Sequence, residues 1–435
     1  MSKIVCKFGG SSLADAPQFF KVAEIVNADP GRRYIVASAP GKRYPVDVKV
    51  TDMLYKCYEL AAKKRDFGPV LHEVGERFRY IIHNLGIGFD MDTELDLIAS
   101  VLKAVPQRDY AASRGEYLNA KILASFLGFP FVDPADYVHF TDDGAYDSER
   151  TERDMADVLT GLPNAVIAGF YGARPDGSIK TFSRGGSDVT GAICAAAVRA
   201  DLYENWTDVS GMLAADPRIV MDPRVIDRIS YRELRILSYM GASVLHTDAV
   251  LPVSRAGIPI NIRNTNQPED PGTMIVTDTY DRRYAVTGVA GRKGLSVVQV
   301  EKAMVSDGAG FVAILLDIFR KHRIPFEQCL TGIDTVSVVI RSDLFRAGKE
   351  RVLGEIREAL VPDMMDVKED LSMIAVVGEG SRDARGVTIR ILNAVEQAGI
   401  PVSTINQGAG DLNLIIGVPE EDYEAAIRTI YGVIK

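Results

Sequence analysis

Two short glycine-rich turns carry the kinds of residue that bind phosphate. The first, Lys7-Phe8-Gly9-Gly10-Ser11-Ser12, follows an apolar run and precedes a helix-like segment. Glycines in such a turn let backbone N–H groups approach an anion closely, and the following helix directs the positive end of its dipole toward it. Lys7 adds a full positive charge. The turn therefore predicts an anion site, although an ordinary tight turn would contain the same glycines.

The second turn, Ser183-Arg184-Gly185-Gly186-Ser187-Asp188, also opens a helix-like segment. It offers backbone donors, a guanidinium group that suits a carboxylate, and an acid in the first helical turn. Asp188 alone would also fit an ordinary N-cap or first-turn residue. Two such turns in one α/β domain, one with lysine and one with arginine and aspartate, favour a phosphate site over two unrelated turns.

Two further clusters place polar residues at expected element ends. In the stretch from Trp206 to Arg218, which follows a strand-like run, Asp208 could accept a hydrogen bond from a nucleotide and Arg218 could pair with phosphate. The alternative is a surface loop rich in turn residues. Ser113-Arg114-Gly115-Glu116 is expected at a helix start, where Glu116 could bind an amino group or be an ordinary first-turn glutamate.

Other classes of chemistry are disfavoured. The chain lacks the GxxxxGK[ST] loop and the HRD and DFG motifs, which excludes P-loop nucleotide binders and protein kinases. A net charge of −9 argues against nucleic acid, and no apolar run approaches the roughly 20 residues that span a membrane. Separated cysteines and scattered histidines predict reduced thiols and no metal site made by protein side chains. We expect a cytoplasmic protein without a signal peptide.

The elements that must position these residues alternate between strand-like and helix-like segments up to about residue 280. Strands are expected at 4–8, 34–37, 165–168 and 202–206, and helices at 17–28, 51–64 and 188–200. This alternation predicts an α/β fold with a mostly parallel sheet and helices on both faces. In such sheets ligands bind at the carboxyl ends of the strands, where both glycine turns would lie.

From about residue 286 the chain contains an internal repeat. Residues 310–340 align without a gap with residues 386–416, so that Gly310 meets Gly386 and Ile324-Pro325 meets Ile400-Pro401. Each copy predicts a helix of about four turns, a strand after the Ile-Pro pair, a glycine turn and a second strand, followed by another helix. Two tandem βαββαβ-like units explain the repeat better than chance similarity of two amphipathic segments.

The order of motifs resembles that of the aspartate kinases in the amino-acid kinase family. The motifs are KFGGSS, SAPG, SRGE, FSRGGSD, WTDVSG…DPR, SYMGASVLH and PINIRNT, and the repeat resembles the paired ACT-type regulatory domains of the same enzymes. The resemblance implies a three-layer αβα sandwich over residues 1–282. It implies a regulatory region over residues 283–435, with ACT-like units at about 300–365 and 370–435 that are either tandem or interleaved.

The resemblance also implies a reaction: transfer of the γ-phosphoryl group of ATP, with Mg²⁺, to the β-carboxylate of L-aspartate, the first step toward lysine, threonine, methionine and diaminopimelate. The acceptor is already ionised, so no general base is needed. The implied catalytic residues are Lys7 and Asp188. Arg184 would bind the α-carboxylate of aspartate and Glu116 its ammonium, with Ser38, Thr51 and Ser187 also near the substrate. The implied ATP-binding residues are Lys7, Gly9, Gly10, Ser11, Thr207, Asp208, Leu213 and Arg218.

Three features depart from the family pattern. Ser243 stands where the family usually has a lysine, Leu213 stands where a tyrosine is common, and the segment from Lys42 to Thr51 is longer than usual. We hypothesise that Lys42 or Arg43 covers the ATP phosphates as a basic lid. The alternative is that both are solvated charges on a surface loop.

The first repeat carries an expected effector site. Residues 304–310 lead into a helix at Phe311, where an α-carboxylate could bind, and Asp307 or Asp334 could bind an ammonium group. The expected effector-binding residues are Met304, Ser306, Asp307, Gly310, Phe311 and Asp334. We predict feedback inhibition by an end-product amino acid, lysine ahead of threonine. By analogy, ACT units pair between chains, which implies a homodimer or a dimer of dimers. The alternatives are a glutamate, carbamate or acetylglutamate kinase of the same fold, and an inactive amino-acid sensor.

Overall fold

The computed structural model describes residues 2–183, 185–242, 245, 247–278, 284–303, 310–379, 386–407 and 413–434. The chain divides into two compact units. The first comprises Met1–Met212, Val225–Leu234 and Val244–Thr279, and the second comprises Leu213–Arg224, Arg235–Ser243 and Tyr280–Lys435.

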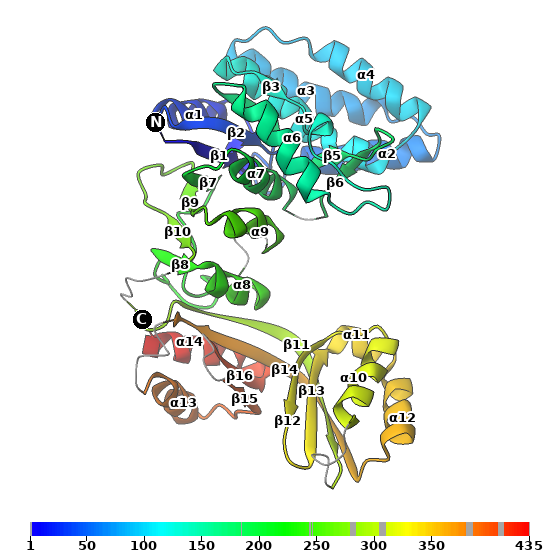
Figure 1. The fold of residues 1–435 in the computed structure, drawn as a ribbon, viewed down its shortest axis with the longest axis vertical. Helices are drawn as coiled ribbons and strands as arrows, with labels where there is room; N and C mark the ends of the chain where they lie inside the picture. Colours follow the sequence, from blue (N-terminus) through cyan, green and yellow to red (C-terminus); the bar gives the residue numbers. More distant parts are fainter. Residues whose placement is uncertain are drawn as a thin grey trace. The chain divides into compact units, whose positions relative to one another are not determined.

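The first unit is built on an eight-stranded sheet in the order β3-β4-β2-β1-β7-β9-β10-β8 (Figure 1). All neighbours in this order are parallel except β9 and β10. The strands are β1 (Ile4–Phe8), β2 (Arg32–Ala37), β3 (Phe131–Val132), β4 (Ala165–Ala168), β7 (Leu202–Thr207), β8 (Arg228–Ser230), β9 (Ile260–Asn264) and β10 (Thr273–Val276). A separate hairpin pairs β5 (Tyr171–Ala173) with β6 (Ile179–Thr181).

Helices cover both faces of this sheet. One face packs against a core formed with α1 to α5, which includes Cys6 and Phe8 of β1. On the other face α7 packs against β1, β2 and β7, and α9 packs on α7. The helices of this unit are α1 (Ala16–Asn27), α2 (Val50–Ala62), α3 (Gly68–Leu85), α4 (Met91–Ala104), α5 (Arg108–Leu127), α6 (Ser148–Thr160), α7 (Gly186–Ala197) and α9 (Thr247–Ala256). Helix α8 (Tyr231–Tyr239) is divided between the two units. The α/β fold class predicted from the sequence is confirmed.

The alternation of β1 explains how a charged residue enters this layered core. Successive side chains of a strand point to opposite faces. Cys6 and Phe8 therefore enter the core under α1 to α5, whereas Lys7 lies on the face that α7 covers. All five residues of β1 are buried, so the chemistry of Lys7 is set by neighbours rather than by water.

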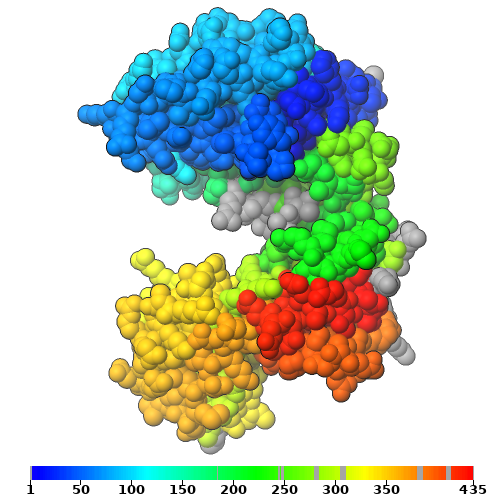
Figure 2. Space-filling model, turned by 180° about the vertical axis from the view of Figure 1, so that it is seen from behind, coloured from blue at the N-terminus to red at the C-terminus, as the bar shows by residue number. Residues whose placement is uncertain are grey.

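The second unit contains a six-stranded antiparallel sheet in the order β12-β13-β11-β14-β16-β15. Its strands are β11 (Gly288–Glu301), β12 (Phe326–Thr331), β13 (Thr335–Arg341), β14 (Met364–Val377), β15 (Thr404–Asn406) and β16 (Asn413–Pro419). Its helices are α10 (Phe311–Lys321), α11 (Ser342–Arg346), α12 (Lys349–Leu360), α13 (Val387–Gln397) and α14 (Tyr423–Ile434). In the space-filling view, the yellow half with α10 to α12 and the orange-to-red half with α13 and α14 form two lobes (Figure 2).

The two halves of this sheet are interleaved through the long strands β11 and β14. Residues 295–301 of β11 pair with β13 and with the first half of β14. Residues 288–292 of β11 instead pair with residues 373–377 of β14, which also pair with β16. The half of the sheet that contains β15 and β16 therefore takes one strand, residues 288–292 of β11, from a part of the chain that precedes the other half.

The helices that open the two repeats begin 76 positions apart, which is the offset of the sequence repeat. Gly310 and Gly386 are their N-caps, and both adopt a positive φ, of 111° and 80°, that other residues rarely adopt. The predicted length was wrong: each helix has 11 residues, or about three turns, rather than four. Among the residues that the structure describes, no helix is long and apolar enough to cross a membrane.

Candidate active site

A buried ion pair lies between β1 and α7. Lys7 Nζ is 2.6 Å from Asp188 Oδ1, and the two side chains are only 11% and 16% exposed. Asn205 of β7 completes the cluster: its Nδ2 donates to Asp188 Oδ1 at 2.9 Å, and its Oδ1 is 3.5 Å from Lys7 Nζ. Lys7 and Asp188, the two catalytic residues predicted from the sequence, thus contact each other and also Asn205, which the sequence analysis did not identify.

The parallel pairing of β1 and β7 makes this meeting possible. Lys7 and Asn205 are register partners, so their side chains leave the same face of the sheet. Asp188 reaches them from the first turn of α7, whose N-cap Gly185 has a φ of 57°. The Tyr203 hydroxyl, also on β7, donates to the backbone carbonyl of Asp188 at 3.2 Å and fixes that turn against the sheet.

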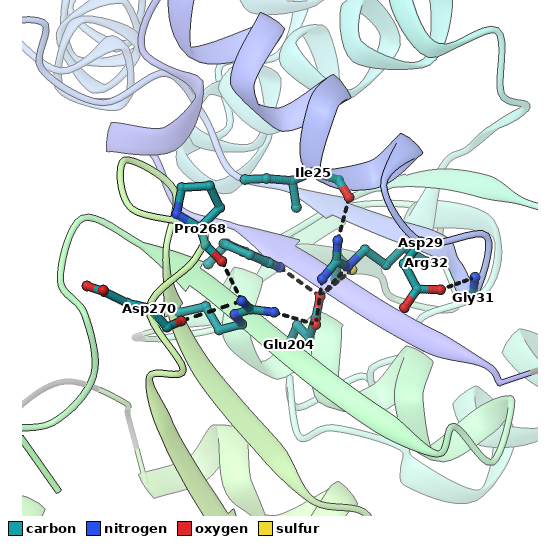
Figure 3. Close-up of polar contacts among 10 residues, drawn as sticks. Ile25, Asp29, Gly31, Arg32, Glu204, Pro268 and Asp270 are labelled. Atoms are coloured by element: carbon teal, nitrogen blue, oxygen red, sulfur yellow. Dashed lines mark hydrogen bonds and ion pairs between the residues drawn. The ribbon is translucent and has the colours of Figure 1, made fainter. Parts of the chain in front are cut away.

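A second polar network lies on the opposite face of β7 and ties the central strands together (Figure 3). Glu204 accepts from Arg32 Nε at 2.8 Å and Nη2 at 3.1 Å, and from Trp206 Nε1 at 3.0 Å. Cys6 Sγ and Arg263 Nη1 are 3.3 and 3.5 Å away. Burial raises the pKa of the Cys6 thiol, so it stays a neutral donor. One carboxylate therefore links β1, β2, β7 and β9 and fixes the position of the residue next to it, Asn205.

The first glycine turn is shaped by contact between two loops. A Cβ on Gly10 would lie 2.9 Å from the carbonyl oxygen of Ala39, and a Cβ on Gly41 would lie 2.5 Å from the carbonyl carbon of Gly10. The N–H of Gly41 donates to the carbonyl of Gly10 at 2.7 Å. Only glycines allow the loops after β1 and β2 to approach this closely. The importance of Gly41 was missed in the sequence, where it is simply the last residue of SAPG.

The expectation that Gly9 donates its N–H to phosphate is wrong for this conformation. That N–H already donates to the carbonyl of Trp206 at 2.9 Å, as a continuation of the β1–β7 ladder. Within the described part of the chain, the N–H groups of Gly10 and Ser11 have no hydrogen-bond acceptor and remain available to a ligand. Ser12, the next residue, hydrogen-bonds Thr265 after β9 at 2.7 Å through the two side-chain hydroxyls.

The hypothesis of a basic lid gains no support from Arg43, whose charge is already paired. Its guanidinium group pairs with Asp47 at 2.9 and 3.0 Å, and Asp47 also pairs with the buried Arg77 at 3.0 Å. The paired arginines hold the pKa of the Asp47 carboxyl far below its usual range. Arg77 in turn donates to the carbonyl groups of Gly41 and Val48. In this structure the charge of Arg43 therefore stabilises the long loop.

Glu116 lies in the middle of a helix, which corrects its predicted place at a helix start. Helix α5 begins at Arg108, and Glu116 is its ninth residue, only 7% exposed. Desolvation by burial raises the pKa of its carboxyl to about 8. A backbone hydrogen bond from Ala39 and the charge of Arg114 lower this pKa, but by less than burial raises it. One turn later, Asn119 donates to the carbonyl of Ser38 at 2.7 Å. Glu116 and Ser38 therefore lie together at the carboxyl end of β2.

The remaining predicted residues of the first unit lie at the ends of elements. Thr51 is half-buried in the first turn of α2. Ser187 is buried in the first turn of α7, where a Cβ on Gly169 would lie 2.5 Å from its Oγ. Thr207 ends β7 and donates to Asp208, which is exposed, at 3.2 Å. Ser187 therefore faces the carboxyl end of β4, and Thr207 and Asp208 lie at the carboxyl end of β7.

The other predicted residues belong to the second unit or lie outside the described residues. Leu213 and Arg218 are part of the second unit, and exposed Arg218 pairs with Asp216, with Nη2 and Oδ2 2.6 Å apart. Phe311 is the first residue of α10, with its side chain in the core, and Asp334 is exposed between β12 and β13. The residues outside the described ranges are Arg184, Ser243, Met304, Ser306 and Asp307.

Comparison with known proteins agrees with this architecture. Residues 2–264 match the amino acid kinase family, and residues 374–433 match an ACT domain. Aspartokinase 3 of Bacillus subtilis is 36% identical over 447 residues, covering 98% of this chain and 97% of that protein. The crystal structure of Clostridium acetobutylicum aspartate kinase matches with 41% identity and a TM-score of 0.91, covering 100% of both chains.

Escherichia coli aspartokinase III has the same fold at lower identity. Its structure with aspartate and ADP matches with 23% identity and a TM-score of 0.76, and its structure with lysine and aspartate with 24% and 0.74, each covering 99% of both chains. The chain belongs to the amino acid kinase family and, within it, to the aspartokinases.

Proposed function

We propose that this chain performs the aspartokinase reaction with Lys7 as its central charge, transferring the γ-phosphoryl group of ATP to the β-carboxylate of L-aspartate. The observation that carries this assignment is the buried Lys7–Asp188 pair beside a glycine turn at the carboxyl ends of the central strands. A carboxylate acceptor is ionised at neutral pH, so the reaction needs positioning and charge stabilisation rather than a base.

Each group at this edge of the sheet then has a role in binding or charge stabilisation. The ammonium group of Lys7 contacts the phosphoryl oxygens as negative charge builds up on them. The free N–H groups of Gly10 and Ser11 bind phosphate oxygens. Glu116 binds the ammonium group of aspartate, and Arg184 binds its α-carboxylate. Ser38, Thr51 and Ser187 line the substrate site, and Thr207 and Asp208 bind the nucleotide.

Mg²⁺ enters with the nucleotide in this proposal. Among the described residues, no three histidine, cysteine, aspartate or glutamate side chains are grouped as a metal cage. Mg²⁺ keeps most of its waters and binds mainly through substrate phosphates, so the proposal assigns it no protein side chain. When bound, the ion offsets charge on the ATP oxygens. The protein side chains orient the acceptor and stabilise the transferring group.

The second unit is proposed to sense an end-product amino acid, lysine ahead of threonine. The ACT match within this unit supports sensing, and the E. coli relative crystallised with lysine supports the choice. The glycine N-cap of α10 offers its helix N-terminus to a carboxylate. We further propose that the enzyme works in the cytoplasm as a homodimer or a dimer of dimers.

Coupled measurement of ADP release tests the function directly. The purified chain with ATP and Mg²⁺ is expected to release ADP with L-aspartate, and not with glutamate, acetylglutamate, carbamate or no acceptor. Lysine at millimolar concentration is expected to lower the rate. Turnover with another acceptor would reassign the substrate, and lysine binding without turnover on any acceptor would support the inactive sensor.

A further inference from the structure

Asn205 is a neutral residue in contact with both members of the candidate catalytic ion pair. It is 5% exposed in the middle of β7, next to Lys7 across the sheet. Its amide must place Nδ2 toward Asp188 and Oδ1 toward Lys7, because the flipped amide would face N–H groups toward an ammonium group. Both contacts therefore report one orientation of the side chain.

The geometry of the pair creates a problem for catalysis. Lys7 and Asp188 are 2.6 Å apart and largely removed from water. Opposite charges attract far more strongly in the protein interior than at its surface. To contact a transferring phosphoryl group, the ammonium group must give up part of this contact. If Lys7 moved away, the buried carboxylate of Asp188 would lose a hydrogen-bond donor. Because burying an unpaired charge is costly, this loss opposes the movement of Lys7.

We propose that Asn205 is a positioning residue that lets Lys7 act on the phosphoryl group, an inference that rests on the proposed function. The amide keeps a hydrogen bond to the Asp188 carboxylate when the ammonium group moves toward the phosphate. Because the amide carries no net charge, it stabilises Asp188 without competing for Lys7. A carboxylate in its place would hold Lys7 more tightly, and an apolar side chain would leave Asp188 dependent on Lys7 alone.

The opposite face of β7 supports this assignment. Glu204, the preceding residue, anchors β7 to β2 through Arg32, as Figure 3 shows, and its carboxylate also contacts Arg263 of β9. This anchoring prevents β7 from shifting along β1. The backbone of Asn205 therefore keeps its position opposite Lys7 in the sheet, and the amide does not move along the strand when Asp188 moves.

Two substitutions that nearly keep the size of the side chain test the proposal in the full-length enzyme. N205D and N205L are each expected to lower kcat about 10- to 100-fold, the usual effect of losing one hydrogen bond to a charged group. KM for aspartate and for ATP is expected to change by less than about threefold, since binding groups are untouched. The control is Y34F, which removes another buried hydrogen bond of the sheet, Tyr34 to Leu159, and is expected to leave kcat unchanged.

The pH profile separates positioning from a general loss of stability. In N205D two carboxylates lie side by side, so one binds a proton more readily and then donates to Asp188 as the amide did. The kcat of N205D relative to the parent is therefore expected to rise as pH falls from about 8.5 to 6, whereas the ratio for N205L stays flat.

Wild-type kcat in N205D, or a change in KM alone, would overturn the positioning role. If N205L does not fold, N205D decides alone. A parent enzyme without aspartate-dependent ADP release would instead refute the proposed function.

Discussion

Replacing the buried Glu116 by glutamine should change how the stability of the first unit depends on pH. The carboxyl has a pKa of about 8 in the folded chain, against 4.5 for the ordinary group, because burial disfavours its charged form. Between these two values the folded chain binds a proton that the unfolded chain releases. The contribution of Glu116 to the free energy of unfolding therefore falls as pH rises, by about 1.4 kcal/mol per pH unit.

Glutamine cannot ionise, so E116Q should lose this dependence. From pH 5.5 to 7.5 the free energy of unfolding of E116Q, relative to the parent, should increase by about 2 to 3 kcal/mol. Trp206 is the single tryptophan of the chain and is 1% exposed, so its fluorescence during urea unfolding reports on the first unit. Glu73, exposed on α3, provides the matched control E73Q.

The same substitution tests the proposed ammonium site. If the ammonium group of aspartate binds the ionised form of Glu116, KM for aspartate should fall as pH rises from about 6.5 to 8.5 in the parent. In E116Q, KM should be higher and nearly independent of pH. A stability difference that stays constant across the pH range would refute the raised pKa, and an unchanged KM for aspartate would refute the role in binding.

Four further substitutions test other parts of the site. K7A should lower kcat on the order of 10²–10³-fold, measured by ADP release, while its circular dichroism stays that of the parent; near-normal kcat would remove Lys7 from the mechanism. G41A should push apart the loops after β1 and β2 and raise KM for ATP several-fold, whereas G88A, whose Cβ would meet nothing within 4 Å, should not; equal KM values would contradict the close contact. D47A should destabilise the first unit by about 3–5 kcal/mol in urea because it leaves the buried Arg77 unpaired, and R43A should leave KM for ATP unchanged.

The sequence predicted elements well where one short run determines them. The runs at 4–8 and 202–206 became β1 and β7, and the glycine turns became the loop after β1 and the start of α7. Local pattern was enough because apolar periodicity and glycine act within a few residues. The same pattern failed at Glu116, because Ser-x-x-Glu resembles a helix start even in the middle of α5.

Hydrogen-bond partners in the site could not be predicted, since they come from residues far apart in the chain. The N–H of Gly9 is taken by Trp206, and the amide of Asn205 reaches Asp188. Both contacts require the β1–β7 pairing and the placement of α7, neither of which a local pattern contains. Two adjacent polar residues inside an expected strand, Glu204 and Asn205, were the one available signal for Asn205.

The two loops that meet at Gly10 and Gly41 connect the phosphate turn to the proposed acceptor site. Gly41 donates to Gly10, and Ala39, two residues earlier, supplies the backbone hydrogen bond to Glu116. A shift of the loop after β1 would therefore be transmitted through these two hydrogen bonds to the carboxylate proposed to bind aspartate. The close contact of Gly10 and Gly41 therefore sets the separation between the proposed phosphate site and the proposed acceptor site, on which an in-line phosphoryl transfer would depend.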